Sequence, residues 1–102
     1  QWNFDEGSGE VTADSSGEGN DGTIVGATWT TGKSGNALDF KGDGTGGRNR
    51  VEIPGNMEDY VYSDHFTVMM WINVTDVNEG AIGAVSDTDA TADAVLSLRV
   101  GR

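Results

Sequence analysis

The sequence contains no cysteine, one proline and one histidine among its 102 residues. Without cysteine the chain has no disulfide framework and no thiol chemistry. Lysine and arginine together number 6 against 17 aspartates and glutamates, which gives a formal net charge of −11. Because phosphate binding requires clustered basic side chains, this composition argues against nucleic acid as a partner. No apolar run approaches the roughly 20 residues of a transmembrane helix, so we expect no membrane insertion.

The sequence also lacks the residue combinations that catalysis requires. The single histidine, His65, has no serine, cysteine or acid at a spacing that indicates a catalytic pair. Glycoside hydrolysis needs two carboxylates across the substrate, but no short strand carries closely spaced glutamates directed to one side. We therefore expect no catalytic residues and no enzymatic activity.

Glycine is abundant, with 16 residues that cluster between short apolar runs. This arrangement is typical of turns in β proteins, and no stretch keeps a helical period of 3.6 residues. Apolar alternation predicts strands at residues 1–5, 23–29, 37–40, 50–53, 66–74 and 94–100. Long loops are expected at residues 6–22 and 42–47, and residues 57–62 fit one helical turn. The pattern predicts an all-β, antiparallel β-sandwich.

Residues 66–74 have the strongest strand pattern in the chain. One face of this strand would be wholly apolar, and consists of Phe66, Val68, Met70, Ile72 and Val74. The other face would be mixed, and consists of Thr67, Met69, Trp71 and Asn73. A strand of this kind belongs in the middle of a sheet. Leu38 and Phe40 are expected to supply core from another strand.

Several short stretches, in this order, resemble the bacterial and archaeal laminin G-like domains. They are WNFDEGSG (residues 2–9), DSSG (14–17), NDG (20–22), ATW (27–29), GKSGNALDF (32–40), VEIP (51–54) and FTVMMWI (66–72). The resemblance implies a concanavalin A-like jelly roll. Members of the family have further strands after this point, including a strand with Trp and His, and none of them is present here. We therefore interpret residues 1–102 as a single laminin G-like domain truncated on its C-terminal side.

The resemblance also implies a function. It predicts a non-catalytic binding module of a secreted or cell-surface protein, which recognises a glycan or an extracellular protein. Two alternatives remain open, namely a structural building block of a surface layer, fibre or adhesin, and an accessory domain of a glycan-active enzyme. The chain begins at Gln1 and shows no signal peptide, which we interpret as a removed leader or a piece of a longer protein.

Many members of the family hold a structural Ca²⁺ ion, so the resemblance implies one here. Asp14, Asn20 and Asp21 place oxygen atoms on one glycine-rich loop, and Asp39 and Asp43 are candidate partners from a neighbouring loop. The loop is not an EF-hand, because its twelfth position is valine where a bidentate glutamate is needed. The alternative is that these five residues are solvated turn residues.

Exposed aromatic residues are the candidates for ligand binding. Trp71 lies opposite the apolar face of its predicted strand, where it would serve as a stacking platform for a sugar or be covered by a second layer. Tyr60 and Tyr62 precede this strand and are the pair expected to be more exposed. Asn73 begins an Asn-Val-Thr glycosylation sequon near the strand end.

The apolar face of residues 66–74 needs a covering layer that the rest of the chain supplies only in part. Open strand edges and apolar faces favour self-association. If the chain folds alone, we therefore expect a homodimer or a larger homo-oligomer.

Overall fold

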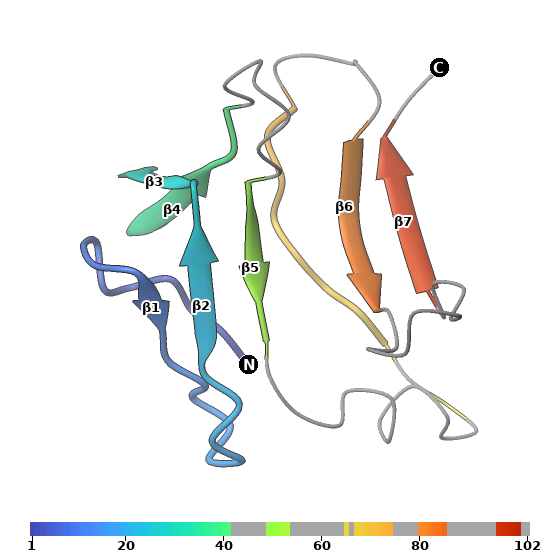
Figure 1. Ribbon diagram of the computed structural model, residues 1–102, viewed down its shortest axis with the longest axis horizontal. Helices are drawn as coiled ribbons and strands as arrows, with labels where there is room; N and C mark the ends of the chain where they lie inside the picture. Colours follow the sequence, from blue (N-terminus) through green and yellow to red (C-terminus); the bar gives the residue numbers. More distant parts are fainter. Residues whose placement is uncertain (42–48, 54–64, 66, 75–79, 86–95, 101–102) are drawn as a thin grey trace. The chain divides into compact units, whose positions relative to one another are not determined.

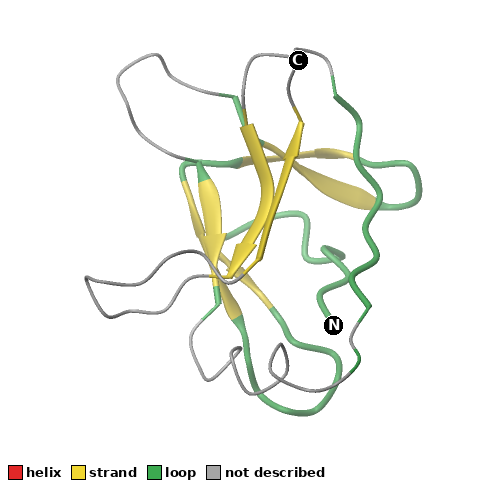
Figure 2. Cartoon of the chain, turned by 90° about the vertical axis from the view of Figure 1, so that its right-hand side faces the viewer, coloured by secondary structure: helices red, strands yellow, loops and turns green. Residues whose placement is uncertain are grey.

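The computed structural model describes residues 1–41, 49–53, 65, 67–74, 80–85 and 96–100. Every regular element within these residues is a β-strand, and none of them is helical (Figure 2). The all-β class predicted from the sequence is thereby confirmed for this part of the chain. These residues contain no helix with the length and apolar character needed to cross a membrane.

The strands form three small antiparallel sheets (Figure 1). They are β1 (Val11–Thr12), β2 (Gly22–Val25), β3 (Thr28–Thr31), β4 (Asn36–Asp39), β5 (Arg50–Glu52), β6 (Gly80–Val85) and β7 (Leu96–Val100). The sheet orders are β1-β2-β5, β3-β4 and β6-β7. The chain divides into two compact units, Gln1–Gly55 and Asn56–Arg102, so that the first two sheets belong to the first unit and the third to the second.

Strand β2 is the centre of the first unit. Thr23 pairs with Val11 of β1 on one side and with Glu52 of β5 on the other. The side chains alternate as a pleated strand requires, since Thr23 is exposed whereas Ile24 is only 5 % exposed. Among the described residues of the first unit, Ile24 is the one buried apolar side chain. The core of this unit is therefore small.

The single strand predicted at residues 23–29 is two strands that lie in different sheets. The break falls at Gly26, whose φ of 72° is in the left-handed region that favours glycine. A Cβ atom at this position would also overlap Oδ1 of Asn49, so that the Asn49 side chain would have to move. The backbone conformation thus favours glycine here, and the chain turns from β2 into β3.

Strands β3 and β4 form a hairpin, in which β4 largely coincides with the strand predicted at residues 37–40. Trp29 pairs with Leu38 and Thr31 with Asn36. The amide of Gly32 donates a 2.9 Å hydrogen bond to the carbonyl oxygen of Gly35, which closes the turn. Leu38 is half-buried, but Phe40 lies beyond the end of β4 and is exposed. The prediction that Phe40 supplies core is therefore wrong.

Residues 1–5 do not form the predicted strand. Trp2 makes one isolated antiparallel bridge with Asp14. Phe4 has a φ of 58°, which is uncommon for a residue with a side chain and ends the extended conformation at that point. Strand β1, by contrast, was not predicted and lies within the loop expected at residues 6–22. Its two residues are too few to show an alternation of their own.

The second unit contains the β6-β7 hairpin sheet. Gly80 pairs with Val100 and Val85 with Leu96, and the register shifts between Ala81 and Gly83. Strand β7 lies within the strand predicted at residues 94–100, which confirms that prediction. Strand β6 was not predicted, because its sequence GAIGAV is rich in small residues that strands generally avoid.

The described residues of the predicted strand 66–74 are not in a strand. Residues 67–74 contain no turn or bend either, and all eight are exposed. The prediction of a central, buried strand is wrong for these residues, because a strand forms only where a neighbouring backbone accepts and donates its hydrogen bonds. Within the described part of the chain, no residue pairs with this segment. We refer to residues 67–74 as the apolar segment.

Candidate functional site

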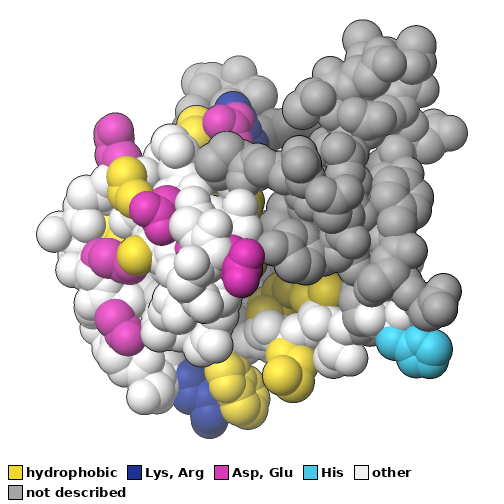
Figure 3. Space-filling model, turned by 90° about the horizontal axis from the view of Figure 1, so that it is seen from below, with side chains coloured by type: hydrophobic (Ala, Val, Ile, Leu, Met, Phe, Trp, Pro, Cys, Tyr) yellow, Lys and Arg dark blue, Asp and Glu magenta, His cyan; other side chains and the backbone are white. Residues whose placement is uncertain are grey.

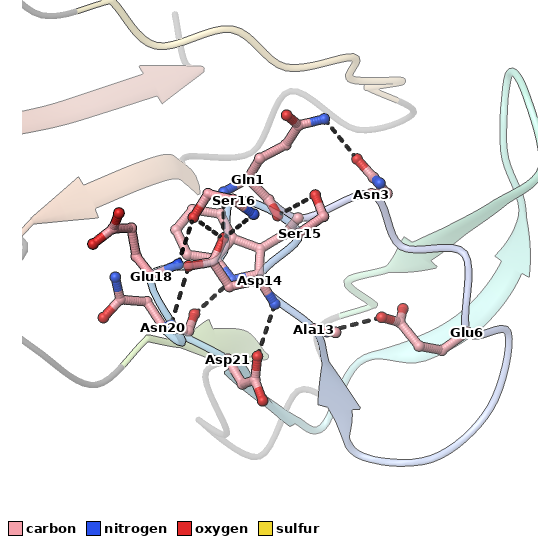
Figure 4. A network of polar contacts seen from close by, with 11 residues as sticks. Gln1, Asn3, Glu6, Ala13, Asp14, Ser15, Ser16, Glu18, Asn20 and Asp21 are labelled. Atoms are coloured by element: carbon pink, nitrogen blue, oxygen red, sulfur yellow. Dashed lines mark hydrogen bonds and ion pairs between the residues drawn. The ribbon is translucent and has the colours of Figure 1, made fainter.

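The loop that follows β1 contains the most connected group of polar side chains in the described residues (Figure 4). Asp14 is its centre, and its side chain is only 1 % exposed. Oδ1 of Asp14 accepts hydrogen bonds from the Gln1 nitrogen at 2.7 Å and from the Ser16 hydroxyl and amide at 2.6 and 3.0 Å. Oδ2 accepts a further hydrogen bond from the Asn20 amide at 3.1 Å. Both carboxylate oxygens are therefore occupied by donors.

These hydrogen bonds fix the charge of Asp14. The amino group of Gln1, then the hydroxyl and amide of Ser16, stabilise the carboxylate and hold the pKa of Asp14 well below its usual range. The amide of Asn20 acts in the same direction, and burial opposes the shift. Asp14 is thus ionised at any pH at which the protein is expected to work.

Further contacts connect this loop to its surroundings. The indole nitrogen Nε1 of Trp2 donates to the carbonyl oxygen of Asn20 at 2.8 Å. Oδ1 of Asp21 accepts from the backbone amide of Asp14 at 2.8 Å. The backbone oxygen of Gln1 accepts from the amide and the hydroxyl of Ser15 at 2.8 and 3.0 Å. The first two residues of the chain are therefore attached to the loop at several points.

The structure brings together three of the five residues predicted to bind calcium. Asp14, Asn20 and Asp21 share the hydrogen-bond network, whereas Asp39 lies at the end of β4, where its carboxylate forms a 3.0 Å ion pair with Lys41. Asp43 lies outside the described residues. Across the ranges that the structure describes, no three His, Cys, Asp or Glu side chains come close enough to hold a metal ion.

The oxygen atoms of this loop do not fit a calcium site. Ca²⁺ takes 6–8 oxygen ligands at about 2.3–2.6 Å, and those oxygens must face the ion. Both oxygens of Asp14 instead face N–H and O–H groups. One oxygen of Asp21 and the carbonyl oxygen of Asn20 also accept hydrogen bonds.

The candidate ligand-binding residue Trp71 lies in the apolar segment and is 84 % exposed. Met69, on the same side of the segment by parity, is 88 % exposed. The even-numbered residues Val68, Met70, Ile72 and Val74 are only 44–53 % exposed. The two sides of the segment therefore differ, and the side with Met69 and Trp71 is the more open. Tyr60 and Tyr62 lie outside the described residues.

The other two tryptophans have a different role from Trp71. Trp2 and Trp29 are half-buried. The indole nitrogen of Trp29 donates to the carbonyl oxygen of Gly9 at 2.8 Å, as that of Trp2 does to Asn20. These two hydrogen bonds attach the indole rings to the backbone at Gly9 and Asn20.

His65 and Asn73 are both exposed. The acidic side chains of the described residues are scattered over the face seen in Figure 3, and they do not gather into one patch. The contacts of Gln1 with Asp14 and Ser15 were not predicted from the sequence. The Asp-Ser-Ser order at residues 14–16 signals a local side-chain turn, but nothing in the sequence indicates that Gln1 returns to it.

No family model matches the chain, and no curated protein or solved structure matches it. The likeness to laminin G-like domains therefore depends on the short stretches of sequence between residues 2 and 74.

Proposed function

We propose that the chain is a non-catalytic binding module of a secreted or cell-surface protein, and that it binds carbohydrate through Trp71. The observation that carries this proposal is the 84 % exposure of the Trp71 side chain. An indole is a large, rigid apolar surface with a polar edge, and such a ring, when exposed, offers a face on which a ligand stacks. Carbohydrates offer both apolar C–H faces and hydroxyl groups to such a surface.

The neighbours of Trp71 support the same ligand class. Met69, two residues before Trp71, is 88 % exposed, and Thr67 and Asn73 are exposed residues of the same segment. A hydroxyl and an amide beside an apolar platform provide the few polar groups that orient a ligand. Among these four residues none is charged, so a neutral ligand fits better than an ionic one.

We also propose a detailed architecture for the chain. The antiparallel sheets and the glycine-rich turns of the first unit support an antiparallel sandwich of the laminin G-like, concanavalin A-like jelly-roll type.

A glycan array tests the proposal with the whole chain and three variants. We expect selective binding by the wild type, at least about tenfold weaker binding by Trp71→Ala, and partial retention by Trp71→Phe, because a phenyl ring preserves stacking. Phe40→Ala is the matched control, since it removes an exposed aromatic ring that lies outside the apolar segment. Equal binding by wild type and Trp71→Ala would reject Trp71 as the platform.

A structural building block is the second candidate, and one observation favours it. The apolar segment has no charged residue although the chain has a net charge of −11, so two copies meet there with the least repulsion. Sedimentation equilibrium at several salt concentrations separates the two functions. Self-association that Trp71→Ala and Met69→Ala both weaken, together with no signal on the glycan array, would favour the building block.

A further inference from the structure

We infer that the Asp14 carboxylate takes the place of a structural calcium ion in the loop of residues 14–21, so that this loop closes without metal. This inference is independent of the proposed ligand. It concerns the residues for which the laminin G-like resemblance implies a calcium site, and it reverses that expectation.

Asp14 lies at the centre of the loop's hydrogen bonds. Its side chain is 1 % exposed and lies between the start of the chain and the loop. It gathers four donors from Gln1, Ser16 and Asn20, which are up to 13 residues away in sequence. A cation in such a loop would gather oxygens around a positive centre. Here the centre is negative, and the loop presents N–H and O–H groups to it (Figure 4).

A calcium ion would have to break several of these contacts. The part-buried amide of Asn20 would need a new acceptor, because a buried polar group without a partner is costly. The bond from the Asp14 amide to Asp21 would also be lost if that oxygen turned to a metal. Asp39, the remaining described acid of the predicted set, is paired with Lys41.

The hydrogen-bond network around Asp14 continues beyond the loop. The bridge between Trp2 and Asp14, and the hydrogen bonds from Ser15 to the backbone oxygen of Gln1, attach the first residues of the chain to the same point. Asp14 is therefore a positioning residue for both the loop and the N-terminal segment. Its loss should release both together.

Amide hydrogen exchange on the whole chain tests the inference, with the protein first exposed to calcium and then measured in excess calcium or excess chelator. We expect the Ser16 and Asn20 amides of the wild type to be equally protected in both. Asp14→Asn should reduce this protection by about tenfold or more in both conditions, because the new NH₂ group faces donors. The melting midpoint of the wild type should likewise be unchanged by chelator.

Asp39→Asn is the matched control, because it removes an acid of the predicted calcium set that does not contact Asp14. It should leave the protection of Ser16 and Asn20 unchanged. A wild type that loses protection or melts earlier in chelator would overturn the inference, and so would unchanged protection in Asp14→Asn. If Asp14→Asn does not fold, the comparison of wild-type protein with and without calcium still decides the question.

The acid limb of the stability curve provides a second readout. The folded-state pKa of Asp14 is lowered from 3.8, so its contribution is fully present above that value and is lost as pH falls toward the lower folded-state pKa. Unfolding of wild type and Asp14→Asn, compared from about pH 2 to pH 5, should show a difference that shrinks as pH falls. Asp21, Glu6 and Glu18, the other acids of the network in Figure 4, are present in both proteins. A difference that grows with acidity would contradict this role for Asp14.

Discussion

Strand β2 and the apolar segment differ in how well their sequence patterns predict their structures. The four residues of β2 include one large buried side chain, Ile24, yet this strand is paired on both sides. The sequence of the apolar segment alternates through eight residues. In the part of the chain that the structure describes, this segment belongs to no β-sheet and its residues are exposed. Alternation thus indicates which side chains would share a face, but partners decide whether the strand forms. The hydrogen bonds of a strand belong to two backbones.

The largest expected effect compares the same residue type in these two regions. Ile24→Ala should lower the free energy of unfolding by about 2–5 kcal/mol, because it leaves a cavity in the small core beside β2. Ile72→Ala, at a side chain that is half exposed, should cost less than about 1 kcal/mol. Urea denaturation of both variants measures the difference. Equal losses would mean that the apolar segment is as well packed as β2.

Gly22, at the start of β2, should be the next most sensitive position. A Cβ atom there would lie 2.7 Å from Cγ1 of Val51 and 2.9 Å from Cγ2 of Thr12, which is too close without movement of both strands. Gly22→Ala should therefore cost about 1–3 kcal/mol in the same denaturation experiment.

The control for Gly22 is Gly9→Asn. Gly9 has a φ of 83° with no atom within 4 Å of a Cβ position, and asparagine tolerates that conformation. It should change stability by no more than about 0.5 kcal/mol. A larger loss from Gly9→Asn than from Gly22→Ala would show that backbone conformation, and not the fit between strands, limits this unit.

Substitution of Thr12 should have a small effect on stability, and Thr12→Val should have one of opposite sign. It is fully buried beside β2, and within the described residues its hydroxyl oxygen has no hydrogen-bond partner. Thr12→Val removes this unsatisfied hydroxyl at nearly constant volume and should raise the free energy of unfolding by about 1 kcal/mol. Thr12→Ser keeps the hydroxyl and removes the methyl group, so it should lower stability by about 1 kcal/mol. Thermal melts of both variants provide the measurement, and destabilisation by Thr12→Val would indicate that the hydroxyl is satisfied.

The candidate site was only partly predictable from the sequence. The density of oxygen-bearing side chains at residues 14–21 correctly located a polar centre, because short polar residues between glycines favour side-chain turns. The kind of contact was not predictable, because composition does not tell whether a carboxylate faces a cation or N–H groups. Gln1 and Asn20, which supply donors to Asp14, lie 13 and 6 residues from it. Their approach depends on the bridge of Trp2 with Asp14 and on the pairing of β1 with β2.

The sequence by itself determined the β class and the positions of β4, β5 and β7, because these elements depend on local alternation and on glycine at turns. Only the tertiary structure decided that residues 23–29 divide at Gly26, where Asn49 from a distant segment occupies the space of a side chain. It also decided that Val11 and Thr12 form a strand, since β2 lies beside them. In the same way, residues 67–74 remain outside any described sheet, because pairing requires a second backbone and no pattern within one segment supplies it.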